Sequence, residues 1–209
     1  MLFSIQKELF DHLPDLTIGM VVATGLDNTH PSREIDQLLQ QAIEVLKKNF
    51  VGGKAQDHPR IKPWRTAFAK LGISGSKFPS SVESMTRRIL KRDPFPKINP
   101  LVDLYNSISL RCLVPMGGGE RVTVPKGELV YRDDQEVLTR NWVWRQCEKD
   151  KATEKTRNIF IPIDVLGEVG SGLADEIVCE LSESIPKHLG GTIFSAILNR
   201  ENPFVEFSF

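Results

Sequence analysis

The chain has 209 residues, of which 40% are hydrophobic, so it can bury one sizeable core and we expect a single domain over residues 1–209. Its 27 basic and 27 acidic residues cancel, which excludes a global basic field of the kind that steers nucleic acid, so any RNA contact should be local and weak. The sequence has no stretch of 18 apolar residues, and residues 1–4 lack a charged leader, so we expect a cytoplasmic protein without membrane contact.

The cysteines offer no metal or disulfide pattern. There are three cysteines, an odd number, and they lie far apart without paired ligand spacing: Cys112, Cys147 and Cys179. We therefore expect ordinary thiols, and we predict no metal and no cofactor.

The first third of the chain predicts the start of an α/β layer. An opening helix is expected within residues 5–13, followed by a largely buried strand over 16–25 that is rich in β-branched residues and ends at a glycine. A long amphipathic helix should then follow Pro31 and Ser32 and stop near residues 51–53.

Residues 58–72 combine prolines, positive charge and an aromatic residue before a short helix. Two interpretations remain open for this stretch. Its basic and aromatic groups could contact RNA, because guanidinium groups pair with phosphate and rings stack on bases. Alternatively, Trp64, Phe68 and Leu71 belong to the core and the charges form a solvated face.

The next helix should begin with a capping box formed by Ser80 and Glu83. Its far end carries Arg87, Arg88 and two further cations, which complement the helix dipole. A Pro-rich break delivers this basic end into Asn99, so a second interpretation is that Arg87 or Arg88 reaches a phosphate or the central site.

The central helix is predicted over residues 99–113. Asn99 is suited to cap it and Pro100 to its first position, and apolar residues cover most of its circumference, so the helix should be largely buried. Asn106 lies within the buried set. Its amide must meet either the protein's own backbone or a ligand, because unmatched polar groups cost about 1–3 kcal/mol.

The rest of the chain predicts several short strands and one helix. Strands are expected near 121–139, at 140–145, at 158–163 on a sheet edge, at 193–198 and at 204–208, and a helix from Leu173 should stop by Pro186. On a strand, Arg140, Trp142 and Trp144 would share one face, either as core or as the wall of a pocket. The class should be α+β, with a mixed, largely antiparallel sheet packed with helices.

Several motifs resemble one known family. Asn-Pro-Leu-Val-Asp at residues 99–103, Tyr-Asn at 105–106 and Pro-Met at 115–116 resemble the editing module of the phenylalanyl-tRNA synthetase beta subunit, its B3/B4 domains. Further segments at 80–88, 127–133, 140–145 and 156–158 resemble freestanding proteins built from that module, so the likeness spans about residues 16–207. The resemblance implies a B3/B4-like fold.

The family module hydrolyses the ester that joins a wrong amino acid to tRNA. Such an ester is already activated, so an enzyme can position a water and stabilise the oxyanion without supplying a covalent nucleophile. Two family groups are replaced here: Gly117 stands where the synthetase usually has a histidine, and the acidic residue after the Thr-x-Asn strand has no counterpart near Pro162. These replacements count against tyrosine-specific editing.

Two hypotheses follow. The chain is either an aminoacyl-tRNA deacylase acting in trans or a non-catalytic module that binds a tRNA end or an aminoacyl or nucleotide-like ligand. The resemblance implies Asn106 and Asp103 as catalytic residues, and the expected substrate-binding residues are Asn99, Arg87, Arg88, Pro115, Gly117, Arg140, Trp142, Trp144 and Arg145.

Overall fold

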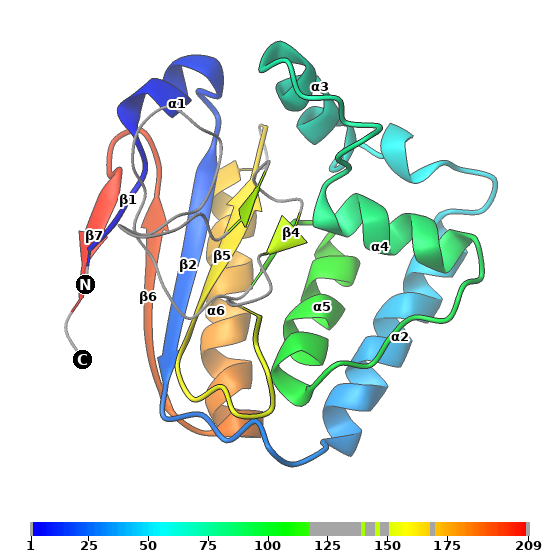
Figure 1. Cartoon of the computed structure of the whole chain (residues 1–209), viewed down its shortest axis with the longest axis vertical. Helices are drawn as coiled ribbons and strands as arrows, with labels where there is room; N and C mark the ends of the chain where they lie inside the picture. Colours follow the sequence, from blue (N-terminus) through cyan, green and yellow to red (C-terminus); the bar gives the residue numbers. More distant parts are fainter. Residues whose placement is uncertain (1, 118–138, 141–144, 147–150, 168–169, 208–209) are drawn as a thin grey trace.

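A computed structural model describes residues 2–117, 139–140, 145–146, 151–167 and 170–207. These residues form an α+β fold with small antiparallel sheets, which confirms the predicted class (Figure 1). The helices are α1 (Lys7–His12), α2 (Arg33–Asn49), η1 (a 3-10 helix, Ala55–Asp57), α3 (Lys62–Lys70), α4 (Ser81–Leu90), α5 (Pro100–Cys112) and α6 (Gly170–Leu189). The strands are β1 (Leu2–Ser4), β2 (Thr17–Thr24), β3 (Thr139–Arg140), β4 (Arg145–Gln146), β5 (Ile159–Val165), β6 (Thr192–Leu198) and β7 (Phe204–Glu206).

The core of the fold is an antiparallel sheet in the order β5-β2-β6. Strand β2 alternates between two apolar layers, as a strand buried on both faces must. Val21 and Ala23 face the core shared with α5 and α6, whereas Ile18 and Met20 face a second cluster that contains Phe10, Trp64 and Phe68. This placement of Trp64 and Phe68 confirms that both rings belong to the core.

Helix α6 packs closely on β2 because one residue of the strand has no side chain. A Cβ built on Gly19 would lie 2.7 Å from Val178 Cγ2 on α6. Figure 1 shows α6 behind the sheet, with α5 and then α2 beside it, and α5 contacts both neighbours. Helix α5 is therefore enclosed between two other helices.

Three helices begin at the residues that the sequence suggested. Ser32 Oγ accepts a hydrogen bond from Ile35 N at 3.3 Å, Ser80 Oγ accepts one from Glu83 N at 3.4 Å, and Asn99 Oδ1 accepts one from Val102 N at 3.0 Å. Each bond satisfies one of the amide groups that a helix leaves free at its start. The predicted cap at Asn99 is therefore confirmed.

Two predictions about chain breaks are wrong. Helix α6 continues through Pro186 to Leu189, because a proline so near a helix end removes only one backbone bond while Ile185 and Leu189 remain buried on either side of it. Arg140 and Arg145 do not share one strand. Arg140 on β3 instead pairs antiparallel with Arg145 on β4.

The ends of the described chain meet in a small sheet that the sequence analysis missed in part. Strand β1 pairs antiparallel with β7, and Phe3 lies opposite Val205. Phe3 packs on the same apolar cluster as Phe10. Strand β7 was predicted, but β1 has only three residues and carries no turn signal of its own.

Candidate functional site

Helix α5 carries the motif on which the functional expectation rests, and it is buried along almost its whole length. Every residue from Leu101 to Leu110 is buried, whereas Arg111 is exposed and pairs with Glu180 on α6. The prediction of a largely buried central helix is confirmed. Its polar side chains are therefore held in a setting where each unsatisfied group costs free energy.

Both polar atoms of the Asn99 side chain, at the start of α5, are bonded within the protein. Its Oδ1 accepts from Val102 N and from Asn28 Nδ2, both at 3.0 Å, and its Nδ2 donates to the Ala152 carbonyl at 3.0 Å. These bonds hold the start of the helix against the segment that precedes β5. In this arrangement Asn99 positions the site, and the substrate-binding role stays a prediction.

Asn28 completes this network, and the sequence analysis did not single it out. It has no exposed surface, and it accepts from Leu101 N at 2.9 Å while donating to the Thr153 carbonyl at 2.8 Å. It lies in a Leu-Asp-Asn-Thr sequence that is typical of an ordinary turn. No local signal in the sequence distinguishes it, because its partners lie more than 70 positions away.

Asp103 lies one turn further along α5 and is 4% exposed. Its Oδ1 accepts a hydrogen bond from Ile98 N at 3.1 Å. Burial raises the pKa of the Asp103 carboxyl and nearby Asp36 raises it further, whereas the Ile98 N–H bond and Lys97 lower it. The net effect makes Asp103 a better proton acceptor than an exposed aspartate.

Asn106 is the polar side chain of α5 that the expected chemistry needs most. It is 8% exposed, its amide makes no hydrogen bond to any residue that the structure describes, and its polar atoms are not fully enclosed. Asn106 lies seven positions after Asn99 and three after Asp103, so all three residues lie on one side of the helix. The two neighbouring hydroxyls differ from it, because Ser107 donates to Leu104 O at 2.7 Å and Ser109 to Val114 O at 2.6 Å.

The segment after α5 runs along the edge of β5. Leu113 ends the helix in the left-handed conformation, with φ 53° and ψ 45°, and Arg60 Nη1 donates to the Cys112 carbonyl at 2.7 Å. Asp164 N then donates to Pro115 O at 3.1 Å, and Met116 bridges Ile163. This segment, which includes Gly117, therefore adds a short antiparallel stretch to the sheet.

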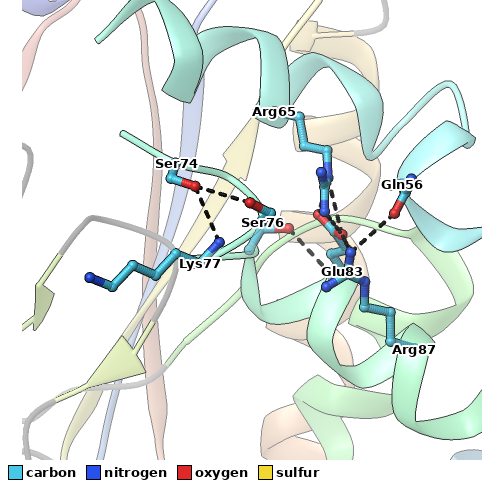
Figure 2. Close-up of polar contacts among 8 residues, drawn as sticks. Gln56, Arg65, Ser74, Ser76, Lys77, Glu83 and Arg87 are labelled. Atoms are coloured by element: carbon cyan, nitrogen blue, oxygen red, sulfur yellow. Dashed lines mark hydrogen bonds and ion pairs between the residues drawn. The ribbon is translucent and has the colours of Figure 1, made fainter. Parts of the chain in front are cut away.

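The two arginines of α4 lie in other contacts. Arg87 Nη2 is 3.0 Å from Glu83 Oε1 and donates to Gln56 Oε1 at 3.1 Å, whereas Arg88 Nε donates to the Pro94 carbonyl at 2.6 Å. Glu83 does not complete the predicted capping box, because its carboxylate binds Arg65 and Arg87 (Figure 2). Arg65 is a second residue that the sequence analysis did not single out.

The remaining expected site residues lie on or between β3 and β4. The backbones of Arg140 and Arg145 are described and pair with each other. Trp142 and Trp144 lie outside the described residues. The strands predicted near 121–138 also lie outside them, as does the family-like segment at 127–133.

The sequence matches no protein-family model and no curated protein. The likeness to the editing module therefore rests on the motif residues themselves. Within the described ranges, no group of three or more His, Cys, Asp or Glu side chains is placed to hold a metal ion, and no described helix is long and apolar enough to cross a membrane. The structure gathers Asn99, Asp103 and Asn106 on one side of α5, and it sets Arg87 and Arg88 in separate contacts on α4.

Proposed function

We propose that this chain is a freestanding tRNA-editing-like domain with a B3/B4-like fold, and that it hydrolyses the ester of mischarged aminoacyl-tRNA in trans. The observation that carries the proposal is the state of Asn106. Its side chain is more than nine-tenths buried and makes no hydrogen bond to a described residue, although it stands in the motif that resembles the editing module. Its oxygen and nitrogen are not among the fully enclosed unpaired atoms of the described residues, so the amide keeps access to a ligand and has donors and an acceptor free to meet one.

The proposed reaction needs few protein groups. A water oxygen attacks the ester carbonyl carbon, the carbon–oxygen bond to the ribose breaks, and the amino acid leaves as a carboxylate while the ribose regains its hydroxyl. The Asn106 amide donates to the oxyanion that forms at the carbonyl oxygen. Asp103, whose pKa is raised by burial, accepts one proton of the attacking water and passes it to the ribose oxygen as the ester bond breaks. The second proton of the water leaves to solvent when the released amino acid ionises to its carboxylate.

The asparagine network explains how such a site keeps its shape. Asn28 and Asn99 join the first turn of α5 to the carbonyls of Ala152 and Thr153. Catalysis by oriented polar groups depends on holding those groups still, so a fixed first turn supports this proposal. In this scheme Asn99 acts as a positioning residue next to Asp103.

The experiment that tests the function is a screen of purified protein against a panel of mischarged tRNAs, in which loss of the ester is followed in single turnovers. Asn106→Ala should lower the rate by about 10²–10³-fold, as expected for the loss of one preorganised donor. Gln41→Ala provides a matched control, because it removes an exposed amide from α2. Equal rates for wild type and Asn106→Ala would contradict the catalytic role of Asn106.

A binding module without hydrolysis is the second candidate. It is favoured by the engagement of Asn99, whose amide oxygen and nitrogen are both used within the protein, and by Gly117 at the position where the editing module usually has histidine. A protein of this kind should bind a non-hydrolysable aminoacyl-tRNA analogue while leaving every ester in the panel intact. Hydrolysis of any ester in that panel would exclude it.

A further inference from the structure

The zero net charge of the chain conceals a strong separation of charge along it. Residues 54–92, which we call the basic segment, contain ten lysines and arginines but only two acidic residues, Asp57 and Glu83, a formal net charge of +8. The rest of the chain must therefore carry −8, because the total is zero. A field this uneven attracts polyanions to one part of the surface.

The fold keeps this charge in one region. The basic segment forms η1, α3 and α4, and η1 contacts both helices. Figure 1 shows these elements at the upper right, on the side of the molecule away from β1 and β7. Most of its cations are exposed, namely Lys54, Lys62, Lys70, Lys77, Arg88, Lys91 and Arg92.

A buried carboxylate fixes the two arginines at the centre of this region, as Figure 2 shows. Arg65 Nε donates to Glu83 Oε1 and Oε2 at 3.1 and 3.0 Å, and its Nη2 donates to Oε1 at 2.6 Å. Arg87 Nη2 lies 3.0 Å from the same Oε1. The Glu83 side chain is 1% exposed, whereas the side chains of Arg65 and Arg87 are 24% and 35% exposed. One buried acid thus holds two cations that still reach water.

The two guanidinium groups retain unused donors. Each guanidinium has five N–H groups. Nη1 of Arg65 and Nη1 of Arg87 make no hydrogen bond to any residue that the structure describes. Glu83 already fixes both arginine side chains. They would therefore lose little further conformational entropy on binding an anion.

A turn with hydroxyl and ammonium donors lies against Arg65. A Cβ built on Gly75 would lie 3.3 Å from Arg65 Cγ, so the turn passes directly over the stem of that arginine. Ser74 Oγ is 3.0 Å from Ser76 Oγ and accepts from Lys77 N at 3.4 Å (Figure 2). The hydroxyls thus lie beside Arg65, whereas the Lys77 ammonium points away from it and lies over the Phe78 ring, 5.3 Å from the centroid. Guanidinium, hydroxyl and ammonium groups all contact phosphate in nucleic acids.

We propose that the basic segment binds the phosphate backbone of RNA, with the Arg65–Glu83–Arg87 cluster fixing the shape of the surface. This inference rests on the proposed function, because that function gives the chain a tRNA partner. An anionic membrane is the less suitable partner. Membrane-binding basic surfaces also present large apolar residues for insertion, and the exposed large hydrophobic residues of the described chain all lie outside residues 54–92.

The test compares two triple charge reversals in the full-length protein. Lys62→Glu, Lys70→Glu and Lys77→Glu change the basic segment, and Lys7→Glu, Lys47→Glu and Lys187→Glu form the matched control, with the same change of net charge at exposed sites elsewhere. Arg65 and Arg87 are left in place because their loss would unpair Glu83 in the interior. The probe is uncharged tRNA, and its affinity is measured by fluorescence polarisation over a series of salt concentrations.

The basic-segment variant should bind at least about 10-fold more weakly than wild type, and its salt dependence should fall by about three units of slope, one for each lost phosphate contact. The control should keep an affinity and slope close to those of wild type. Equal weakening of both variants, or unchanged binding by the basic-segment variant, would overturn the inference. If the basic-segment variant loses binding to phosphatidylserine vesicles while its tRNA binding is unchanged, the inference is also overturned, and the basic segment is a membrane surface instead.

This test is separate from the test of hydrolysis, because the probe carries no ester. If the protein hydrolyses esters in the mischarged panel but the basic-segment variant binds tRNA as well as wild type does, this inference alone is overturned. Binding that depends on the basic segment, with every ester left intact, would overturn the deacylase proposal and leave the RNA surface in place.

Discussion

Asn28 and Asn99 lie 71 positions apart in sequence, and their side chains meet in the interior, where Asn28 Nδ2 donates to Asn99 Oδ1 across 3.0 Å. Each amide also serves one free N–H group of the first turn of α5, Leu101 N for Asn28 and Val102 N for Asn99. Two loops and a helix are therefore joined by a single pair of side chains. The pair links the end of the loop after β2 to the start of the motif helix.

Asn28→Ala should destabilise the protein substantially. The change leaves Leu101 N without its partner in a buried setting and the Thr153 carbonyl without its partner in a part-buried one, and a buried unpaired group costs about 1–3 kcal/mol. The free energy of unfolding, measured with urea, should fall by about 2–5 kcal/mol in total. The control is Asn158→Ala, whose exposed side chain makes a single bond to Gly25 N, so its loss should be smaller. Equal losses for the two variants would show that the buried network adds nothing to stability.

Asn106→Ala should keep most of its stability. The amide has no hydrogen-bond partner among the described residues, so its removal strands no described polar group. We expect the free energy of unfolding to change by less than about 1 kcal/mol while the single-turnover rate of ester hydrolysis falls. A variant that loses stability but keeps its rate per folded molecule would identify Asn106 as a structural residue.

Asp103→Asn should change how stability depends on pH. Because burial raises the pKa of Asp103 in the folded protein, the fold holds the proton more tightly than the unfolded chain does, and stability from this group is lost as the pH rises through the folded pKa. The asparagine variant stays neutral and can still accept from Ile98 N.

The advantage of Asp103→Asn over wild type should therefore grow from about pH 4, near the ordinary pKa of aspartate, and level off above the folded pKa. Urea unfolding at a series of pH values measures this difference. A difference that stays constant with pH would mean that the Asp103 carboxyl titrates alike in the folded and unfolded states.

Gly19→Ala tests the close approach of α6 to the sheet. The new methyl group would lie 2.7 Å from Val178 Cγ2, so β2 and α6 must move apart or Val178 must repack, at a cost of about 1–3 kcal/mol. Gly172→Ala is the matched control, because its Cβ would meet nothing within 4 Å and alanine favours a helix by about 1 kcal/mol over glycine. Thermal unfolding should show a lower midpoint for Gly19→Ala and an equal or higher one for Gly172→Ala. A midpoint for Gly19→Ala that matches wild type would show that the contact can relax freely.

The sequence by itself determined the elements whose signals are local. Strand β2 and helices α2, α4 and α5 lie where hydrophobic period and end signals placed them, and the cap at Asn99 is confirmed at atomic distance. It also determined the α+β class and the burial of Asn106. Periodicity and capping act within one or two turns of chain, so a single sequence is enough to read them.

Only the tertiary structure decided which side chains are partners. Glu83 satisfies the local pattern of a capping box, yet its carboxylate binds Arg65, 18 positions away, because a buried carboxylate is stabilised more by a guanidinium than by one backbone amide. The partners of Asn28 lie more than 70 positions away, and Arg140 lies opposite Arg145 through the pairing of β3 with β4. These contacts join distant segments, and no local pattern specifies them. The separation of the whole charge into +8 and −8 was readable from the sequence, but only the fold brings η1, α3 and α4 into one surface.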